Sequence, residues 1–441
     1  MTRNNNNNIN YKFNIDKFYK DYLKGPKIFK NRDALEPSFI PNDLPHRDKE
    51  IQKIAELTAC ALTGDAPPSF LCYGMTGTGK TATIRYVSQK LAQQPILESI
   101  PWWIYINCNV VSTPYRILAH IYNTISLREK IPPTGLPKDI IFKKLLGLLD
   151  QKVGNSICFL VLDEIDKLIE NKKGGNEILY DLTRLNENLD YCKTSLIGIS
   201  NKLKFRENLD PRVLSSLGEE LPIVFHPYNA TQLGDILKDR AKIAFYDGVL
   251  EEGIIRLCAG LAAKEDGDAR KALQLLRKAG ELAQRAQNKI ITSKHLYDAQ
   301  NDLEKDHIIE YILGMPLQAK LVLTAIYLLS KFPESPVIII SGDVYGVYAE
   351  LCDIILGIRK LTERRISDYI NELTLAGIIS APVKSMGYHG RTKVIKLDID
   401  MTLLKSVLSK IKKIKKVLNY KPSLLQSDKV KLKDNIFKRL I

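Results

Sequence analysis

The stretch Gly74-Met75-Thr76-Gly77-Thr78-Gly79-Lys80-Thr81 decides the fold of the chain. It fits the pattern G-x-x-x-x-G-K-[ST], in which glycines let consecutive backbone N–H groups curve around phosphates. An apolar run at residues 70–73 precedes it, and apolar residues at helical spacing follow it from Ala82 to Leu91. Strand, glycine-rich turn and helix form the context that this pattern requires. We therefore predict a nucleotide site, with Lys80 at the β- and γ-phosphates and the Thr81 hydroxyl on Mg²⁺.

Four more apolar runs predict the rest of a sheet. They lie at residues 103–108, 157–162, 196–200 and 223–225, and we expect the first of them to be a buried strand. Helical patterns separate the runs, so the predicted fold class is α/β with a mostly parallel sheet. Ligands of such sheets bind at the carboxyl ends of the strands. The polar residues at two of these ends are therefore expected beside the nucleotide.

Those polar residues suit ATP hydrolysis. Asp163 is expected to hold Mg²⁺, directly or through water, and Glu164 to polarise the attacking water. Asn201 could orient the same water from the neighbouring strand. The alternative is an acidic strand cap for the two acids and an ordinary turn residue for Asn201.

Two arginines further along the chain are candidates for charge stabilisation. Arg212 lies in Asp210-Pro211-Arg212-Val213, where no partner in its own chain is evident. It could stabilise the γ-phosphate in its own or a neighbouring subunit, or be an ordinary surface arginine. Arg270 begins a predicted helix and could grip a nucleotide between two domains, which would couple the nucleotide state to domain closure.

The pattern changes twice after residue 228. Residues 229–305 predict a small helical domain whose last helix ends near Asp302. Helices predicted at 316–330, 343–356 and 362–376, followed by strands at 378–383 and 392–397, give the element order of a winged helix. Arg364, Arg365 and Asn371 face outward on the third helix. Winged helices bind DNA or other proteins, and the pattern alone leaves both open.

The net charge of +15 is concentrated at the C-terminus, because residues 401–441 carry 12 Lys and Arg and two Asp, hence +10. This asymmetry indicates either a polyanion partner or a solvated tail. Apolar residues at helical spacing predict one basic amphipathic helix between residues 404 and 418. Such a helix could pack on its own protein, on DNA or on a membrane surface.

Composition also narrows the cellular setting. No apolar run approaches the roughly 18 residues of a membrane span, and the N-terminal sequence has no apolar signal core, so we expect a cytoplasmic protein. The Asn-rich residues 1–10 are of low complexity and are predicted to be disordered. The seven cysteines are scattered without a C-x-x-C pair, which predicts buried reduced thiols and no zinc site.

Taken together, these segments resemble the AAA+ ATPase superfamily. More narrowly, they resemble the archaeal initiators related to the eukaryotic origin recognition complex and to the cell-division-control loader ATPase. The resemblance covers residues 25–400, and its specific parts are Leu44-Pro45-His46-Arg47 before the glycine-rich loop, Gly267-Asp268-Ala269-Arg270, and Gly390-Arg391-Thr392 beside the winged-helix pattern. The Asn-rich N-terminus and the basic tail match nothing in the family pattern.

The resemblance implies a role for each candidate residue. Lys80 and Thr81 are the implied Walker A residues, and Asp163 and Glu164 the implied Walker B residues. Asn201 is the implied sensor 1 residue and Arg270 the implied sensor 2 residue. Arg212 is the implied arginine finger. The implied nucleotide contacts are Phe39, Ile40, Pro41, His46, Arg47, Gly74, Met75, Thr76, Gly77, Thr78, Gly79, Lys80, Thr81, Tyr228 and Arg270. The implied DNA contacts are Arg364, Arg365 and Asn371 on the third helix, in the major groove, and Tyr388, Arg391 and Lys393 on the wing, in the minor groove.

The resemblance also implies a domain order and a function. The domains would be a disordered tail at 1–10, an AAA+ nucleotide-binding domain at 11–228, a helical lid at 229–305, a winged-helix DNA-binding domain at 306–400 and a basic extension at 401–441. The function implied is an archaeal replication initiator with slow, switch-like ATP hydrolysis. It would bind origin DNA through the winged helix and an insertion around residues 114–140. Its implied partners are the replicative minichromosome maintenance helicase and other initiator subunits. Two rivals stay open: a branch-migration motor, and a transcriptional regulator whose bound nucleotide is structural.

Overall fold

The computed structural model describes residues 25–95, 99–126, 128–170, 174–217, 222–264, 266–332, 338–355, 358–385 and 391–426. The chain divides into two compact units, Met1–Gln300 and Asn301–Ile441. The Asn-rich residues 1–10, Tyr388 and the tail beyond residue 426 lie outside the described residues. None of the described helices is both long and apolar enough to cross a membrane. All seven cysteines are free thiols and all except Cys60 are buried, as predicted.

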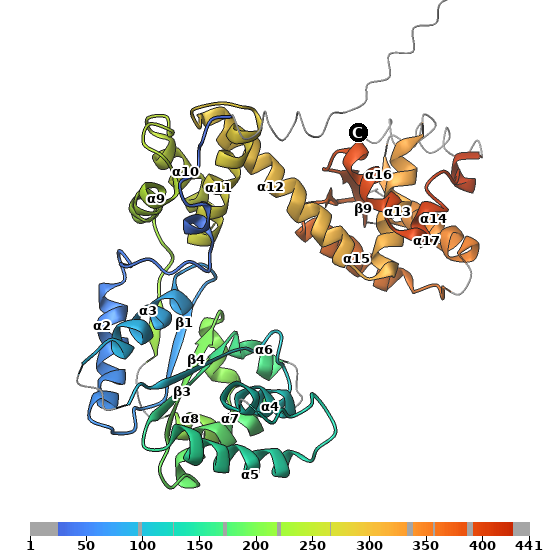
Figure 1. The fold of residues 1–441 in the computed structure, drawn as a ribbon. Coiled ribbons are helices and arrows are strands. Elements are labelled where there is room, and N and C mark those ends of the chain that lie inside the picture. The colour runs from blue at the N-terminus through green and yellow to red at the C-terminus, as the bar shows by residue number, and fades with distance from the viewer. Residues whose placement is uncertain are drawn as a thin grey trace, which may run out of the picture. The chain divides into compact units, whose positions relative to one another are not determined.

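A five-stranded parallel sheet forms the centre of the first unit (Figure 1). Its order is β2-β3-β4-β1-β5, and the strands are β1 (Phe70–Gly74), β2 (Trp102–Asn107), β3 (Ile157–Asp163), β4 (Lys193–Ser200) and β5 (Ile223–Phe225). The predicted parallel α/β fold is therefore confirmed. The strand predicted at residues 103–108 is confirmed as β2, but it is buried only in part: Ile104 and Ile106 are 1% exposed, whereas Trp103 and Tyr105 are partly buried because β2 lies at the edge of the sheet.

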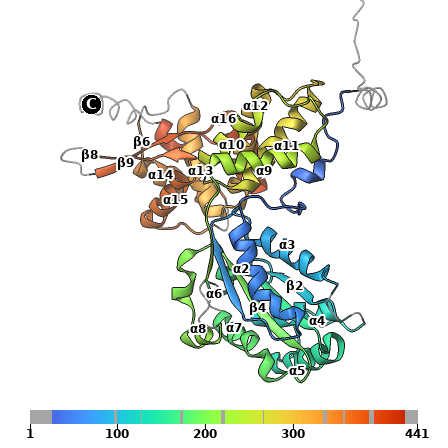
Figure 2. The ribbon, with the colours of Figure 1, turned by 90° about the vertical axis from the view of Figure 1, so that its left-hand side faces the viewer.

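Helices cover both faces of this sheet. On one face lie α2 (Asp48–Thr58) and α3 (Lys80–Ala92), which are side by side in Figures 1 and 2. The other face carries α4 (Pro114–Ile125), α5 (Lys138–Leu148), α6 (Ile165–Glu170), α7 (Gly175–Thr183) and α8 (Pro211–Ser216).

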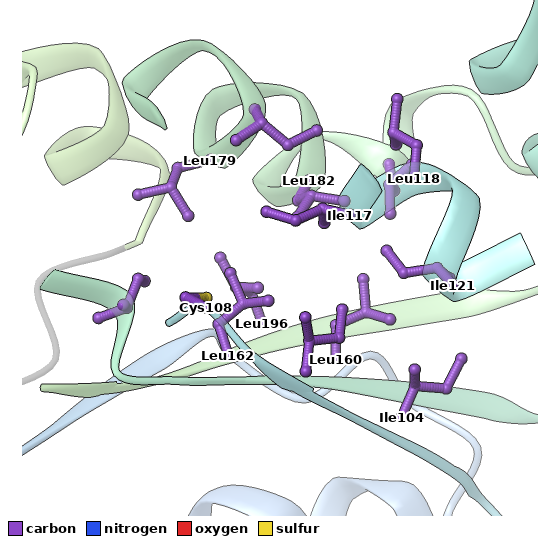
Figure 3. Close-up of a cluster of buried hydrophobic side chains, with 14 of the residues drawn as sticks. Ile104, Cys108, Ile117, Leu118, Ile121, Leu160, Leu162, Leu179, Leu182 and Leu196 are labelled. Atoms are coloured by element: carbon purple, nitrogen blue, oxygen red, sulfur yellow. The ribbon is translucent and has the colours of Figure 1, made fainter. Parts of the chain in front are cut away.

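The central strands supply a hydrophobic core to each of these layers. Leu160 and Leu162 of β3 point toward α4 and α7 (Figure 3), whereas Phe159 and Val161 pack toward α2 and α3. Side chains alternate between the faces of a strand, so a strand covered on both faces is apolar throughout. This explains the continuous apolar run that ends at Asp163.

The rest of the first unit is a helical lid. It contains α9 (Ala230–Ala244), α10 (Ile254–Lys264), α11 (Ala269–Arg285) and the beginning of α12 (Ser293–Gly314). The predicted last helix was too short, since α12 runs through the expected boundary at residue 306 and ends before Pro316. No glycine or proline interrupts the sequence between Thr292 and Leu313, so nothing local ends the helix earlier.

An N-terminal segment, residues 28–36, also packs on the lid, although the sequence places it with the nucleotide-binding domain. It contains the short helix η1 (Arg32–Leu35), which contacts α9 and α11. Ile28, Ala34 and Leu35 are fully buried, and Glu36 forms an ion pair with Arg277 of α11. The chain therefore passes between lid and sheet twice, once after Glu36 and once after β5.

The second unit contains the predicted winged helix. Its helices are α13 (Leu317–Lys331), α14 (Ser341–Ile354) and α15 (Glu363–Leu375). Its strands are β6 (Ile339–Ile340), β7 (Ile379–Ser380), β8 (Val383–Ser385) and β9 (Arg391–Leu397), and β9 pairs antiparallel with the other three. The two-residue strand β6 was not predicted, because a run this short carries no periodic signal.

The C-terminal extension is part of this second unit. The single predicted helix is wrong: α16 (Met401–Ser409) and α17 (Lys412–Lys415) are separated at Ile411, whose backbone is extended with φ −89° and ψ 107°. The apolar side chains are nevertheless buried in the winged-helix core. Of the three possible surfaces, the extension packs on its own protein.

Candidate nucleotide-binding site

The glycine-rich loop joins the end of β1 to the start of α3. Gly77 and Gly79 have φ of 69° and 90°, a left-handed conformation that glycine adopts without strain. Lys80 is the first residue of α3 and is 5% exposed. Its Nζ donates to the carbonyl oxygens of Gly74 at 2.8 Å and Met75 at 2.6 Å. Burial lowers the pKa of Lys80 to about 8, an effect that Asp163 opposes and Arg270 reinforces.

A cavity of about 500 Å³ opens beside this loop. Its walls come from the loop and α3, from the segment that leads into α2, and from the lid. Residues from the loop and α3 are Gly77, Gly79, Thr81, Ala82 and Arg85, joined by Asp163 at the end of β3. The other walls include Phe39, Ile40, Pro41, Tyr228, Arg240, Ala269, Arg270 and Leu273. The cavity therefore brings the predicted phosphate loop, four further implied nucleotide contacts (Phe39, Ile40, Pro41 and Tyr228) and the lid arginine to one place.

Thr81 and Asp163, predicted as the metal pair, are in direct contact. The Thr81 hydroxyl donates to Asp163 Oδ2 at 2.8 Å, and Asp163 Oδ1 accepts from the Glu164 N–H at 3.0 Å. A hydroxyl and a carboxylate are hard oxygen donors, and both residues line the cavity. The donor set fits Mg²⁺ bound together with nucleotide phosphates.

Glu164 and Asn201 lie at the same edge of the sheet. Asp163 pairs with Ile199 in the β3–β4 register, so Asn201 follows two residues after that partner. The Asn201 N–H donates to Oδ1 of the buried Asp166 at 3.1 Å, which fixes the backbone after β4. Neither Glu164 nor Asn201 is among the residues that line the cavity.

The lid touches the phosphate loop directly, a contact that the sequence did not predict. The Ala269 N–H donates to the Gly77 carbonyl at 3.2 Å. A Cβ at Gly77 would lie 1.7 Å from Asp268 Oδ1, so only glycine fits below this carboxylate. Asp268 also caps α11 by accepting from the Arg270 N–H at 2.7 Å. The contact sets Arg270 at the cavity in the first turn of its helix.

Arg212 does not line this cavity. It lies in the first turn of α8, with 71% of its side chain exposed. Its Nε and Nη2 donate to the two carboxylate oxygens of Asp210 at 3.1 and 3.0 Å, and its guanidinium lies over the Tyr180 ring at 5.3 Å. The expectation that it has no partner in its own chain is therefore wrong, because Asp210 both caps α8 and pairs with it.

Two of the implied nucleotide contacts, His46 and Arg47, are not among the residues that line the cavity. His46 pairs with Asp235 of α9 at 2.8 Å. Arg47 is only 4% exposed and donates to the carbonyl oxygens of Thr78 and His226. Conversely, Arg240 was missed: it lies over the Phe39 ring at 4.8 Å and donates to the Phe39 carbonyl at 2.8 Å. An arginine within an amphipathic helix gives no sequence signal for such a contact.

The candidate DNA contacts lie in the second unit. Arg364, Arg365 and Asn371 are exposed on α15, as predicted. Arg365 pairs with Asp368 at 3.5 Å and lies over the Tyr369 ring, whereas the structure gives Arg364 no ion pair among the described residues. Lys393 of β9 donates to Ser367 Oγ and Asn371 Oδ1, both at 2.7 Å. Arg391 is exposed at the start of β9.

The fold and the site together define a P-loop ATPase of the AAA+ class with a lid and a C-terminal winged helix. Family models agree along the chain: an AAA domain matches residues 65–206, a Cdc6 AAA+ ATPase-type lid domain residues 234–301, and a CDC6 C-terminal winged helix domain residues 310–407. The chain belongs to the archaeal ORC1-type DNA replication proteins.

Several relatives carry this assignment. The ORC1-type DNA replication protein of Pyrococcus furiosus is 48% identical over 401 residues, which are 90% of this chain and 94% of the relative. ORC1-type DNA replication protein 1 of Methanosarcina mazei is 43% identical over 93% of this chain and 97% of its own. The structure of the Aeropyrum pernix ORC1 protein in complex with DNA has a TM-score of 0.76 and 41% identity, and covers 88% of this chain and 99% of that protein.

Proposed function

We propose that this protein is an ATP-dependent replication initiator that binds origin DNA and helps to load the minichromosome maintenance helicase. One observation carries the proposal furthest: Arg364, Arg365 and Asn371 are exposed together on the third helix of a winged helix. The chain is 41% identical to the Aeropyrum pernix ORC1 protein, which was solved in complex with DNA. This similarity supports DNA as the partner over another protein. We place the protein in the cytoplasm, associated with the nucleoid.

The proposed DNA contacts divide by their chemistry. Arginine and asparagine side chains on a helix suit base edges in the major groove, and Arg391 on the wing suits the minor groove. The insertion around residues 114–140, which contains α4 and the beginning of α5, would add a second contact with DNA. Lys393 already donates hydrogen bonds to Ser367 and Asn371 of α15. We therefore propose that it holds these two side chains in place and also adds positive charge.

The proposed nucleotide chemistry assigns one task to each candidate residue. Lys80 and the N–H groups of the glycine-rich loop bind the phosphates, while Thr81 and Asp163 hold Mg²⁺, which neutralises phosphate charge. Glu164 accepts the proton of the attacking water and Asn201 orients it. Arg270 binds the nucleotide from the lid. Arg212 is exposed and is not among the residues that line the cavity of its own chain, which supports a role at the nucleotide of a neighbouring subunit. Hydrolysis would be slow and would act as a switch.

Measurements of DNA affinity on a cognate and a random duplex test the proposal. Arg364→Ala and Asn371→Ala should each cost on the order of 1–3 kcal/mol on the cognate duplex, with little loss on random DNA, because base contacts carry the sequence preference. Arg256→Ala, on the lid helix α10, is the matched control and should change neither. Equal losses on both duplexes would mean that α15 does not recognise the sequence.

A further inference from the structure

Arg47 is a buried cation at the point where the two connections between lid and sheet meet. It precedes α2, and its guanidinium carbon lies 3.9 Å from the ring centroid of Tyr228, which follows β5. Arg47 Nη2 donates to the His226 carbonyl at 2.7 Å, and Nη1 lies 3.4 Å from Glu50 Oε1. The Glu50 carboxylate therefore balances its charge inside the protein.

The same guanidinium also binds the glycine-rich loop. Arg47 Nε donates to the Thr78 carbonyl at 3.0 Å. The peptide group is planar, and in the trans form its C=O and its N–H point in opposite directions. The Thr78 carbonyl points at Arg47, so the Gly79 N–H on the same peptide points away from Arg47, and Gly79 is one of the residues that line the cavity. None of the described residues accepts a hydrogen bond from that N–H.

Tyr228 connects the same arginine to the cavity wall. A Cβ at Gly79 would lie 2.8 Å from the Tyr228 hydroxyl, and a Cβ at Gly267 would lie 2.3 Å from the Tyr228 carbonyl. Tyr228 therefore fits closely between the phosphate loop and the turn that precedes α11. Its position is set by the guanidinium that covers one face of its ring.

We propose that Arg47 is a positioning residue of the nucleotide site rather than a ligand contact. It fixes the Thr78–Gly79 peptide so that the Gly79 N–H faces the phosphates, and it holds Tyr228 as a wall of the cavity. The inference rests on the proposed nucleotide chemistry and deepens it. A planar guanidinium can donate in these separate directions while it stacks on a ring, whereas an ammonium group cannot.

The test compares ADP with adenosine as competitors of a fluorescent ADP analogue. Arg47→Lys keeps a cation beside Tyr228 but cannot hold both carbonyls, so ADP should bind about tenfold more weakly, the loss of one aligned hydrogen bond. Adenosine, which has no phosphate, should bind within about twofold of the parent protein. Tyr228→Leu removes the wall and should weaken both ligands by the same factor. Arg256→Lys, the same exchange on the lid helix α10, should change neither.

Several results would overturn this inference. If Arg47→Lys weakens ADP and adenosine equally, Arg47 only supports the fold of the site, and if it weakens neither, it positions nothing. Lys80→Ala separates this failure from failure of the site itself. Retained ADP binding in Lys80→Ala would refute the nucleotide assignment, whereas lost binding there with an unaffected Arg47→Lys would refute the role of Arg47 alone.

Discussion

Removing the C-terminal extension should unfold the winged helix rather than simply remove positive charge. Residues 401–426 place seven apolar side chains, each at most 5% exposed, in the core of the second unit. They are Leu404, Val407, Leu408, Ile414, Val417, Leu418 and Leu425. Each contributes roughly 1.5–3 kcal/mol on burial, or roughly 10–20 kcal/mol together as an upper bound. A domain is stable by only about 5–15 kcal/mol, so a loss of this size is comparable with the whole stability of the second unit.

The same truncation also removes hydrogen bonds between the extension and the winged helix. Tyr420 donates to Glu350 Oε2 of α14 at 2.8 Å, the Ser423 N–H donates to the same oxygen at 3.1 Å, and Lys331 donates to the Leu418 carbonyl at 3.1 Å. Most lysines of the extension are exposed opposite its buried face, which is why the sequence resembles a free amphipathic helix. Charge and core packing therefore cannot be separated by deleting the whole extension.

Calorimetry of two truncated chains provides the measurement. A chain of residues 1–400 should lose the unfolding transition of the second unit and with it sequence-specific DNA binding, while ADP binding by the first unit persists. A chain of residues 1–426 is the control, because every contact described for the extension remains. Unfolding of the 1–400 chain at the temperature of the 1–426 chain would refute the reasoning.

The remaining predictions concern the nucleotide site. Lys80→Ala should abolish ATP binding, and Glu164→Gln should bind ATP but stop hydrolysis, as measured by equilibrium binding and phosphate release; wild-type turnover in Glu164→Gln would remove Glu164 from its role. The folded-state pKa of Lys80 is about 8, below its ordinary value of 10.5. Between these pH values the unfolded chain binds more protons, so the stability of the nucleotide-free protein should rise with pH. In the same window ADP affinity should fall by about tenfold per pH unit, because phosphate binding requires the ammonium form; an ADP affinity that stays constant across this window would exclude Lys80 as the titrating group. Arg212→Ala should keep ATP affinity but lower hydrolysis only at concentrations where subunits meet, and mixing it with Lys80→Ala should restore activity; a concentration-independent defect would place the residue in its own subunit's site.

The sequence predicted most of the fold because its signals are local. Continuous apolar runs marked β1, β3 and β4, which are covered on both faces, and the glycine-rich loop identified the strand–turn–helix around Lys80. Edge strand β2 was predicted as a strand, but its burial was overestimated, because apolar content alone does not tell how far each face of a strand is covered. The C-terminal extension was misread for a related reason: the spacing of apolar residues predicts a helix but does not locate a break such as the one at Ile411.

The candidate site was predicted in its parts but not in its connections. Thr81 with Asp163, and Arg270 with the loop, meet at the cavity because parallel strands end together and the lid begins beside them. The roles of Arg47, Asp268 and Arg240 depend on contacts between residues far apart in the chain, such as Arg47 with His226. No spacing in the sequence carries that information, so these residues required the structure.

Footprinting on the protein's own chromosomal DNA, with ATP and with ADP, tests the central claim most directly. If the protein is an ATP-switched initiator, it should protect sites beside a replication origin, and the extent of protection should differ between the two nucleotides. Arg364→Ala should lose the protection, while Arg256→Ala should keep it. Protection spread evenly over the chromosome, or confined to promoters far from any origin, would contradict the proposed function.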